Sequence, residues 1–88
     1  NGVTPLFIAA RKGLLLSAKE LVASGAQVNL PGPGGRTPLQ AAVRAGNSAV
    51  VKLLFAAGAD VALADADGWT PLHSAANRGK SAAMKVLL

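Results

Sequence analysis

Small and apolar residues recur along the chain in two kinds of short block, each closed by a glycine. The first kind is rich in Ala and follows a Thr-Pro pair, as in Thr37-Pro38 ahead of residues 41–43. The second kind is more strongly apolar: residues 49–55 present one wide apolar face that Lys52 interrupts. This pattern predicts pairs of short helices joined by a turn.

The ends of the first helix in each pair are marked by residues with known capping preferences. A Thr hydroxyl accepts a backbone N–H at the N-cap, and Pro fits the first helical position because no donor is needed there. Glycine favours the left-handed conformation that closes many helices. These rules place N-caps at Thr4, Thr37 and Thr70, and closing glycines at Gly13, Gly46 and Gly79.

The two-helix unit repeats with a period of 33 residues and without a gap. One such pair cannot bury its apolar face alone, whereas stacked pairs cover one another. We therefore expect a single all-α solenoid, with units at residues 1–33, 34–66 and 67–88, the last of them truncated. Eight positions are identical in all three units, namely Gly2, Thr4, Pro5, Leu6, Ala9, Gly13, Lys19 and Leu21 with their equivalents.

The period and the motif together resemble the ankyrin repeat family. The family pattern is a 33-residue unit with Thr-Pro-Leu-His-x-Ala, and the third unit carries it whole from Thr70 to Ala75. The resemblance covers all 88 residues and implies helix-turn-helix units connected by β-hairpin-like loops.

Two departures from the family pattern concern the side chains near the loops. Phe7 and Gln40 replace the His of the motif. The loop at residues 31–35 contains two prolines and three glycines and lacks an acidic residue equivalent to Asp65 of the next loop. We expect this first loop to lack the usual hydrogen bonds at its tip, or to form a distinct, stiffened loop.

Composition limits the class of protein. Hydrophobic residues make up 51% of the chain and charged residues 15%, and no unit has the polar outer face of a capping repeat. We therefore expect a segment of a longer array, with more repeats on at least one side. The chain has no Cys, so it needs no oxidising compartment, and it has no apolar run long enough to insert into a membrane. Its location is unknown from the sequence, with the cytoplasm or the nucleus favoured.

Candidate catalytic chemistry is sparse. His73 is the only histidine, and a lone imidazole without an orienting partner is a poor catalyst. Asp65 and Asp67 precede a glycine in a turn composition, and the further ligands of a calcium loop are missing. The sequence therefore predicts no enzyme, no metal site and no cofactor, and gives His73 a structural role within the turn.

The basic residues indicate binding. The net charge is +5, and Arg11 lies one period before Arg44, so stacking should place these two side chains next to each other. The ankyrin resemblance implies that partners bind the loop tips and the concave face of the first helices. A solvated face that keeps the array soluble is the alternative. The candidate binding residues are Arg11, Lys12, Arg36, Arg44, Asp67, Trp69, Asn77 and Arg78.

These observations favour a non-catalytic protein–protein interaction module or scaffold, monomeric or part of a larger chain. Acidic or phosphorylated segments are the favoured partners because arginines make charge-assisted hydrogen bonds to them. The alternatives are a recruitment or regulatory segment of a larger enzyme or channel, and a nucleic-acid-binding surface. Nucleic acid is less favoured because aromatic residues do not alternate with the basic ones.

Overall fold

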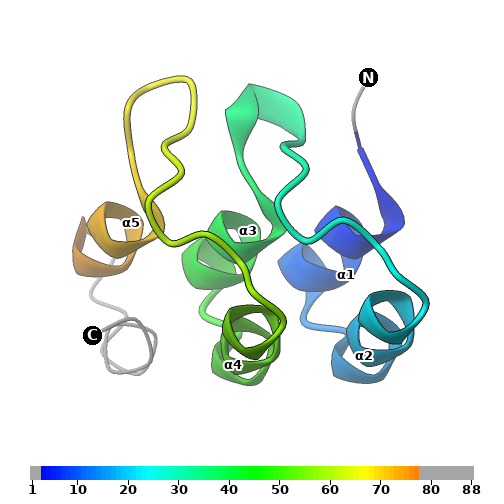
Figure 1. The fold of residues 1–88 in the computed structure, drawn as a ribbon. Coiled ribbons are helices and arrows are strands. Elements are labelled where there is room, and N and C mark those ends of the chain that lie inside the picture. The colour runs from blue at the N-terminus through cyan, green and yellow to red at the C-terminus, as the bar shows by residue number, and fades with distance from the viewer. Residues whose placement is uncertain (1–2, 78–88) are drawn as a thin grey trace.

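A computed structural model describes residues 3–77 of the protein, and Figure 1 shows how its helices are arranged. Within these residues the secondary structure is helical and contains no β-strand, which confirms the all-α prediction. The elements are α1 (Pro5–Lys12), α2 (Leu15–Ala23), the 3₁₀ turn η1 (Pro33–Gly35), α3 (Pro38–Ala45), α4 (Ser48–Ala56) and α5 (Pro71–Asn77).

The Thr residues at the predicted N-caps accept hydrogen bonds from backbone amides. Thr4 Oγ1 accepts from the amide of Phe7 at 3.1 Å, and Thr37 Oγ1 accepts from the amide of Gln40 at 3.3 Å. Thr70 Oγ1 accepts equivalently at the start of α5. The predicted starts of the first helices are therefore confirmed.

The closing glycines are confirmed for the two units in which the structure describes them. Gly13 and Gly46 have φ angles of 74° and 77°, in the left-handed region. A Cβ at Gly13 would also lie 2.8 Å from Oδ1 of Asn47. Asn47 Nδ2 donates to the carbonyl of Ala10 at 2.9 Å, so this side chain ties the end of α1 to the next unit. Gly79 lies outside the described residues.

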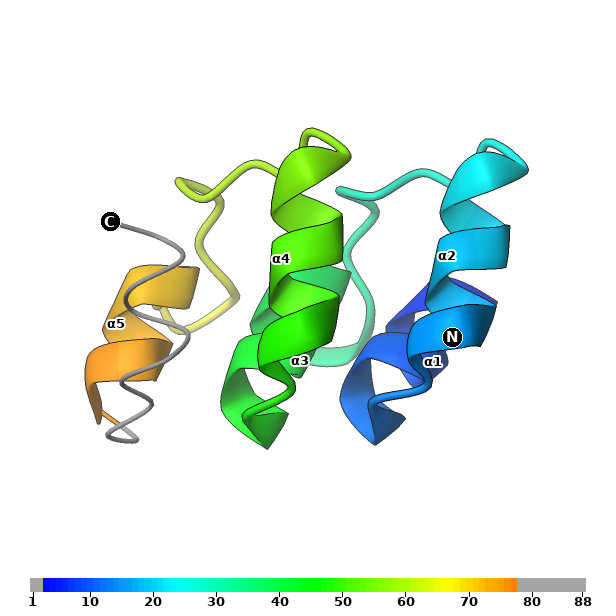
Figure 2. The ribbon, with the colours of Figure 1, turned by 90° about the horizontal axis from the view of Figure 1, so that it is seen from below.

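The helices form two layers. Helices α1, α3 and α5 lie in one row, and Figure 2 shows α2 in front of α1 and α4 in front of α3. Each first helix packs on the next, α1 on α3 and α3 on α5, and α2 packs on α4. The connecting loops extend from the side of the first helices that lies away from α2 and α4 (Figure 1).

Stacking explains which residues are buried. Pro5 is exposed, whereas Pro38 and Pro71, at the same position of the next two units, are buried against the preceding unit. Ala42 and Ala75 are 0% exposed, because a small side chain lets neighbouring helices approach closely. Within the described residues, no helix is long and apolar enough to cross a membrane.

The first loop keeps the backbone hydrogen bonds of the second and lacks its side-chain hydrogen bonds. Gly32 N–H donates to the carbonyl of Arg36 at 2.7 Å, as Asp65 N–H donates to that of Trp69 at 2.8 Å. Asp65 Oδ1 also accepts from the amides of Asp67 and Trp69, at 2.8 and 3.0 Å. The expectation that the first loop lacks its tip hydrogen bonds was therefore wrong for the backbone.

Phe7 accounts for the missing acid in the first loop. A Cβ at Gly32 would lie 2.8 Å from Cδ1 of Phe7, whose ring is buried. The Phe7 ring thus fills the space that a side chain at position 32 would need. The two departures from the repeat pattern, Phe in place of His and Gly in place of Asp, are therefore linked.

The two loops are joined to each other. Ala66 N–H donates to the carbonyl of Gly34 at 2.9 Å. A Cβ at Gly35 would lie 2.9 Å from the backbone nitrogen of Ala66, so the loops are in contact through their backbones. This contact fixes the second loop, which carries Trp69, against the first.

Candidate binding surface

The backbone amide and the backbone carbonyl of Trp69 both form hydrogen bonds that anchor the residue. Its amide donates to Asp65 within the loop, and its carbonyl accepts from Nε2 of Gln40 on α3. Gln40 is fully buried, and its hydrogen bond to the half-buried Trp69 is partly shielded from water. The residue that replaces the His of the motif therefore anchors the next loop on the preceding first helix.

His73 belongs to the turn network, as predicted. Its Nδ1 lies 3.0 Å from Thr70 Oγ1 and accepts from the amide of Thr70 at 3.3 Å. The ring packs edge-on against Trp69, with 6.4 Å between ring centroids and 73° between ring planes. Among the described residues, no group of three or more His, Cys, Asp or Glu side chains forms a potential metal site.

Three arginines line one hollow of about 280 Å³ between α1, α3 and the first loop. Arg11 and Arg44 face it from equivalent positions of successive first helices, and Arg36 faces it from the end of the loop. The guanidinium carbon of Arg11 lies 5.8 Å from the centroid of the Phe7 ring, a cation–π arrangement. We call this the arginine hollow; its other lining residues are Phe7, Pro33, Ala41 and Ala45, so none of the described residues that line it is acidic.

A second hollow of about 290 Å³ adjoins the first, because Arg36 and Arg44 line both. We call it the mixed hollow; it is lined by Arg36, Arg44, Asp65, Asp67, Trp69 and Asn77. The amide of Trp69 lowers the pKa of Asp65, partial burial opposes this, and the Asp67 amide, Arg36 and Arg44 lower the pKa further. Asp65 is therefore ionised at neutral pH and holds the loop, and Asp67 is exposed at its tip.

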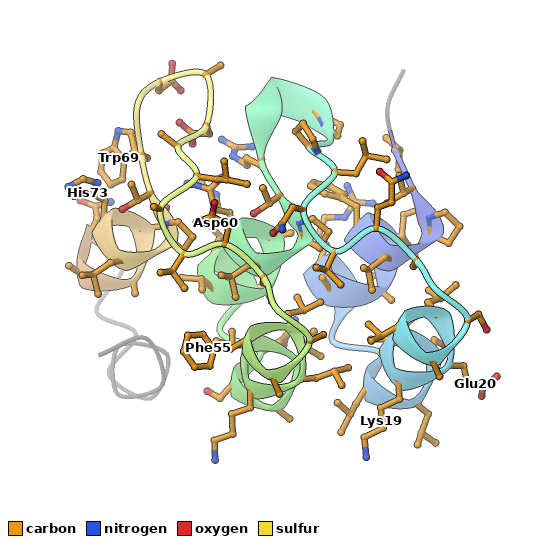
Figure 3. The ribbon with its side chains drawn as sticks, viewed as in Figure 1. Lys19, Glu20, Phe55, Asp60, Trp69 and His73 are labelled. Atoms are coloured by element: carbon orange, nitrogen blue, oxygen red, sulfur yellow. The ribbon has the colours of Figure 1, made fainter. Side chains whose placement is uncertain are left out.

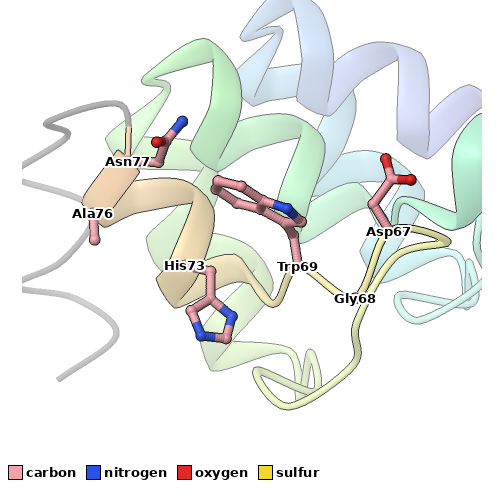
Figure 4. A pocket seen from close by; sticks show the side chains of 6 residues that line it. All are labelled: Asp67, Gly68, Trp69, His73, Ala76 and Asn77. Carbon is pink, nitrogen blue, oxygen red and sulfur yellow. The ribbon is translucent and has the colours of Figure 1, made fainter.

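The third hollow, of about 320 Å³, lies at Trp69 and is shown in Figure 4. We call it the tryptophan hollow; it is lined by Asp67, Gly68, Trp69, His73, Ala76 and Asn77. Trp69, Asp67 and Asn77 also line the mixed hollow, so the three hollows adjoin one another in a row. We call the surface that contains them the first-helix face.

The structure brings most of the candidate binding residues onto this face. Of the eight, the three described arginines line the arginine hollow, and Asp67, Trp69 and Asn77 line the other two. Lys12 is exposed at the end of α1 and lines none of the three hollows. Arg78 lies outside the described residues.

Sequence reasoning missed the apolar and loop residues that complete the hollows. Phe7 was noted as a substitution in the motif, and its contact with Arg11 was not anticipated. The only signal was an aromatic residue four positions before an arginine on a predicted helix, a spacing at which side chains meet. The missed lining residues are Phe7, Pro33, Ala41, Asp65, Gly68, His73 and Ala76.

The opposite side of the molecule carries other charges. Lys19 and Lys52 are exposed at equivalent positions of α2 and α4, and Lys19 points away from the loops in Figure 3. Their spacing along the stack equals that of Arg11 and Arg44. Substitutions at these two lysines therefore serve as a matched control for the same charge changes at Arg11 and Arg44 on the first-helix face.

Comparison with known families gives two overlapping matches. A family model for ankyrin repeats (3 copies) matches residues 1–65, and a second model for ankyrin repeats (many copies) matches residues 49–88. Comparison with curated proteins found no match. The matches together reach both ends of the chain.

Proposed function

Because the chain belongs to the ankyrin repeat family, whose members are generally non-catalytic protein–protein interaction modules, we propose that it binds a partner protein on its first-helix face. The partner contributes an acidic segment, and binding involves no chemical step. The rigid stack positions the face before the partner arrives, which reduces the ordering that association requires.

The observation that carries this proposal is the arginine hollow. Arg11, Arg36 and Arg44 line it together, and none of its described lining residues is acidic. Guanidinium groups beside an apolar floor attract carboxylates or phosphates more strongly than fully hydrated charges do. Trp69 lies along the same face, and Trp and Arg are the residue types that most often dominate binding energy.

The experiment is a nuclease-treated pull-down from the source lysate with three forms of the chain. The first is unchanged, the second carries Arg11→Glu and Arg44→Glu, and the third carries Lys19→Glu and Lys52→Glu. The last two have the same net charge and the same spacing of substitutions along the stack, and circular dichroism checks that both fold. We expect a partner to be captured by the first and third forms and lost from the second.

Equal loss from both substituted forms would mean that only net charge matters. Equal capture by all three would place the binding site away from the arginines. Either result would contradict the proposal.

A further inference from the structure

We propose that the first-helix face recognises a phosphorylated side chain in the arginine hollow and an apolar side chain in the tryptophan hollow, both from one extended segment of the partner. This inference rests on the proposed function and specifies the partner's chemistry.

The arginine hollow suits a dianion. Three guanidinium groups converge on it, and although Arg36 and Arg44 also face Asp65 and Asp67 in the mixed hollow, none of the described residues that line the arginine hollow itself is acidic. Arginine donates paired hydrogen bonds that match the oxygens of a phosphate group. Phe7 and Ala41, both buried, form part of an apolar floor that strengthens these interactions by excluding water.

Two of the three arginines are restricted by their surroundings before binding. Arg36 is half-buried, and its Nε is shielded from solvent and has no hydrogen-bond partner among the described residues. Arg11 lies over the ring of Phe7. Preorganised donors lose less side-chain entropy when an anion binds, so the hollow is suited to bind a phosphate group.

The tryptophan hollow suits an apolar side chain. The rings of Trp69 and His73 and the methyl group of Ala76 line it together with Gly68 (Figure 4). The backbone of Trp69 is anchored through Asp65 and Gln40, and its ring packs edge-on against that of His73, so the aromatic wall is formed in the absence of a ligand. An aromatic wall in a preformed hollow binds an aliphatic or aromatic side chain by burying its apolar surface.

The mixed hollow, which adjoins both of the others, does not suit a second phosphate group. Asp65 and Asp67 face it alongside Arg36 and Arg44, so a second anion there meets two negative charges. A peptide backbone is neutral and can donate its amides to Asp67 and to the Asn77 side chain. Along the row, the arginine hollow therefore accepts an anion, the mixed hollow accepts a stretch of peptide backbone, and the tryptophan hollow accepts an apolar side chain.

The spacing of the two side chains follows from the stack. The arginine hollow lies between α1 and α3, and the tryptophan hollow lies beside α5. Neighbouring helices lie about 8–10 Å apart, so the two hollows are about 10–15 Å apart. An extended chain advances about 3.3 Å per residue, which puts the apolar residue about three to four positions from the phosphorylated one.

The test uses fluorescein-labelled peptides with phosphoserine and Leu separated by three residues, Gly-Ser-Gly, made in both orders. Three reference peptides replace phosphoserine by Glu, phosphoserine by Ser, or Leu by Ser. Binding to the full chain is measured by fluorescence anisotropy at fixed salt. Emission of Trp69, the only tryptophan among the 88 residues, reports on the tryptophan hollow.

We expect one of the two phosphopeptides to bind about tenfold or more tighter than its Glu form, since hydrogen bonds to charged groups contribute about 1.5–3 kcal/mol each. Arg11→Gln with Arg44→Gln should weaken that peptide about tenfold or more, whereas Lys19→Gln with Lys52→Gln should change its affinity less than about twofold. Leu should shift the Trp69 emission to shorter wavelength, and its replacement by Ser should abolish that shift.

Three results would overturn the inference: equal affinity for the Glu and phosphoserine peptides, equal weakening by the arginine and lysine substitutions, or no dependence of Trp69 emission on Leu. Tighter binding of a single-stranded oligonucleotide with the same arginine dependence would instead identify a nucleic-acid surface. If the phosphopeptides fail while the pull-down still depends on Arg11 and Arg44, the proposed function stands and this inference alone is rejected.

Discussion

The contact between the two loops gives a sharp test of how the stack positions Trp69. Gly35 and Gly68 occupy the same position in successive units, and both have positive φ angles, 73° and 84°. A Cβ at Gly35 would lie 2.9 Å from the backbone nitrogen of Ala66, whereas a Cβ at Gly68 meets nothing within 4 Å. Gly35→Ala and Gly68→Ala therefore share the backbone strain and differ in the loop contact.

The loss of stability in each variant can be estimated from the backbone strain and the loop contact. Alanine in the left-handed region costs about 1–2 kcal/mol, and about 0.4–1 kcal/mol is offset because alanine restricts the unfolded chain. Gly68→Ala should thus destabilise the protein by about 1 kcal/mol. Gly35→Ala must in addition separate the loops and lose the Ala66–Gly34 hydrogen bond, which adds about 0.5–1.5 kcal/mol, for a total of about 1.5–2.5 kcal/mol.

The assay is urea unfolding followed by Trp69 fluorescence and far-UV circular dichroism. With a slope of about 1 kcal/mol per molar urea, typical of a small domain, the midpoints of the two variants should differ by about 0.5–1.5 M. The Gly35→Ala protein should also show altered Trp69 emission without denaturant. Equal midpoints for the two variants would refute the reasoning that the loops are locked together through their backbones.

Three further predictions concern other contacts in the stack. Asn47→Ala should destabilise the protein by about 1 kcal/mol, because its amide no longer satisfies the carbonyl of Ala10; urea unfolding measures this, and an unchanged midpoint would contradict it. The pKa of Asp65 is below its ordinary value of 3.8, so its stabilisation is present at neutral pH and is lost as the pH falls through the folded-state value. Asp65→Asn should remove that acid-dependent loss in a pH titration of unfolding, and an identical acid profile in both proteins would count against it. Gly32→Asp should destabilise the chain with Phe7 present and do so by about 1 kcal/mol less in a Phe7→Ala background, as a double-mutant cycle would show; additive effects would mean that the two positions are independent.

The sequence predicted the features that depend on local chemistry and on the repeat. Thr caps, closing glycines and the 33-residue period act within a few residues or recur in register, so the first helices and their stacking could be inferred directly. The pairing of Arg11 with Arg44 followed from the same period, and both line one hollow.

What could not be predicted depends on contacts between units that differ from the repeat pattern. The Phe7 ring and Gly32 share a space that neither position reveals alone, and the buried Gln40 reaches a backbone carbonyl 29 residues later. The backbone of the first loop forms its hydrogen bond without an acidic side chain, because two residues with positive φ close the turn. Composition indicated only that this loop was unusual.

The most direct test of the central proposal, that a partner binds the first-helix face, is chemical-shift mapping of the isotopically labelled chain against the captured partner segment. We expect four side-chain signals to shift together with a single affinity: the Nε–Hε signals of Arg11, Arg36 and Arg44, and the indole signal of Trp69. The amides around Lys19 and Lys52 should stay unchanged. Shifts concentrated on α2 and α4, with the arginine and indole signals unmoved, would contradict the account.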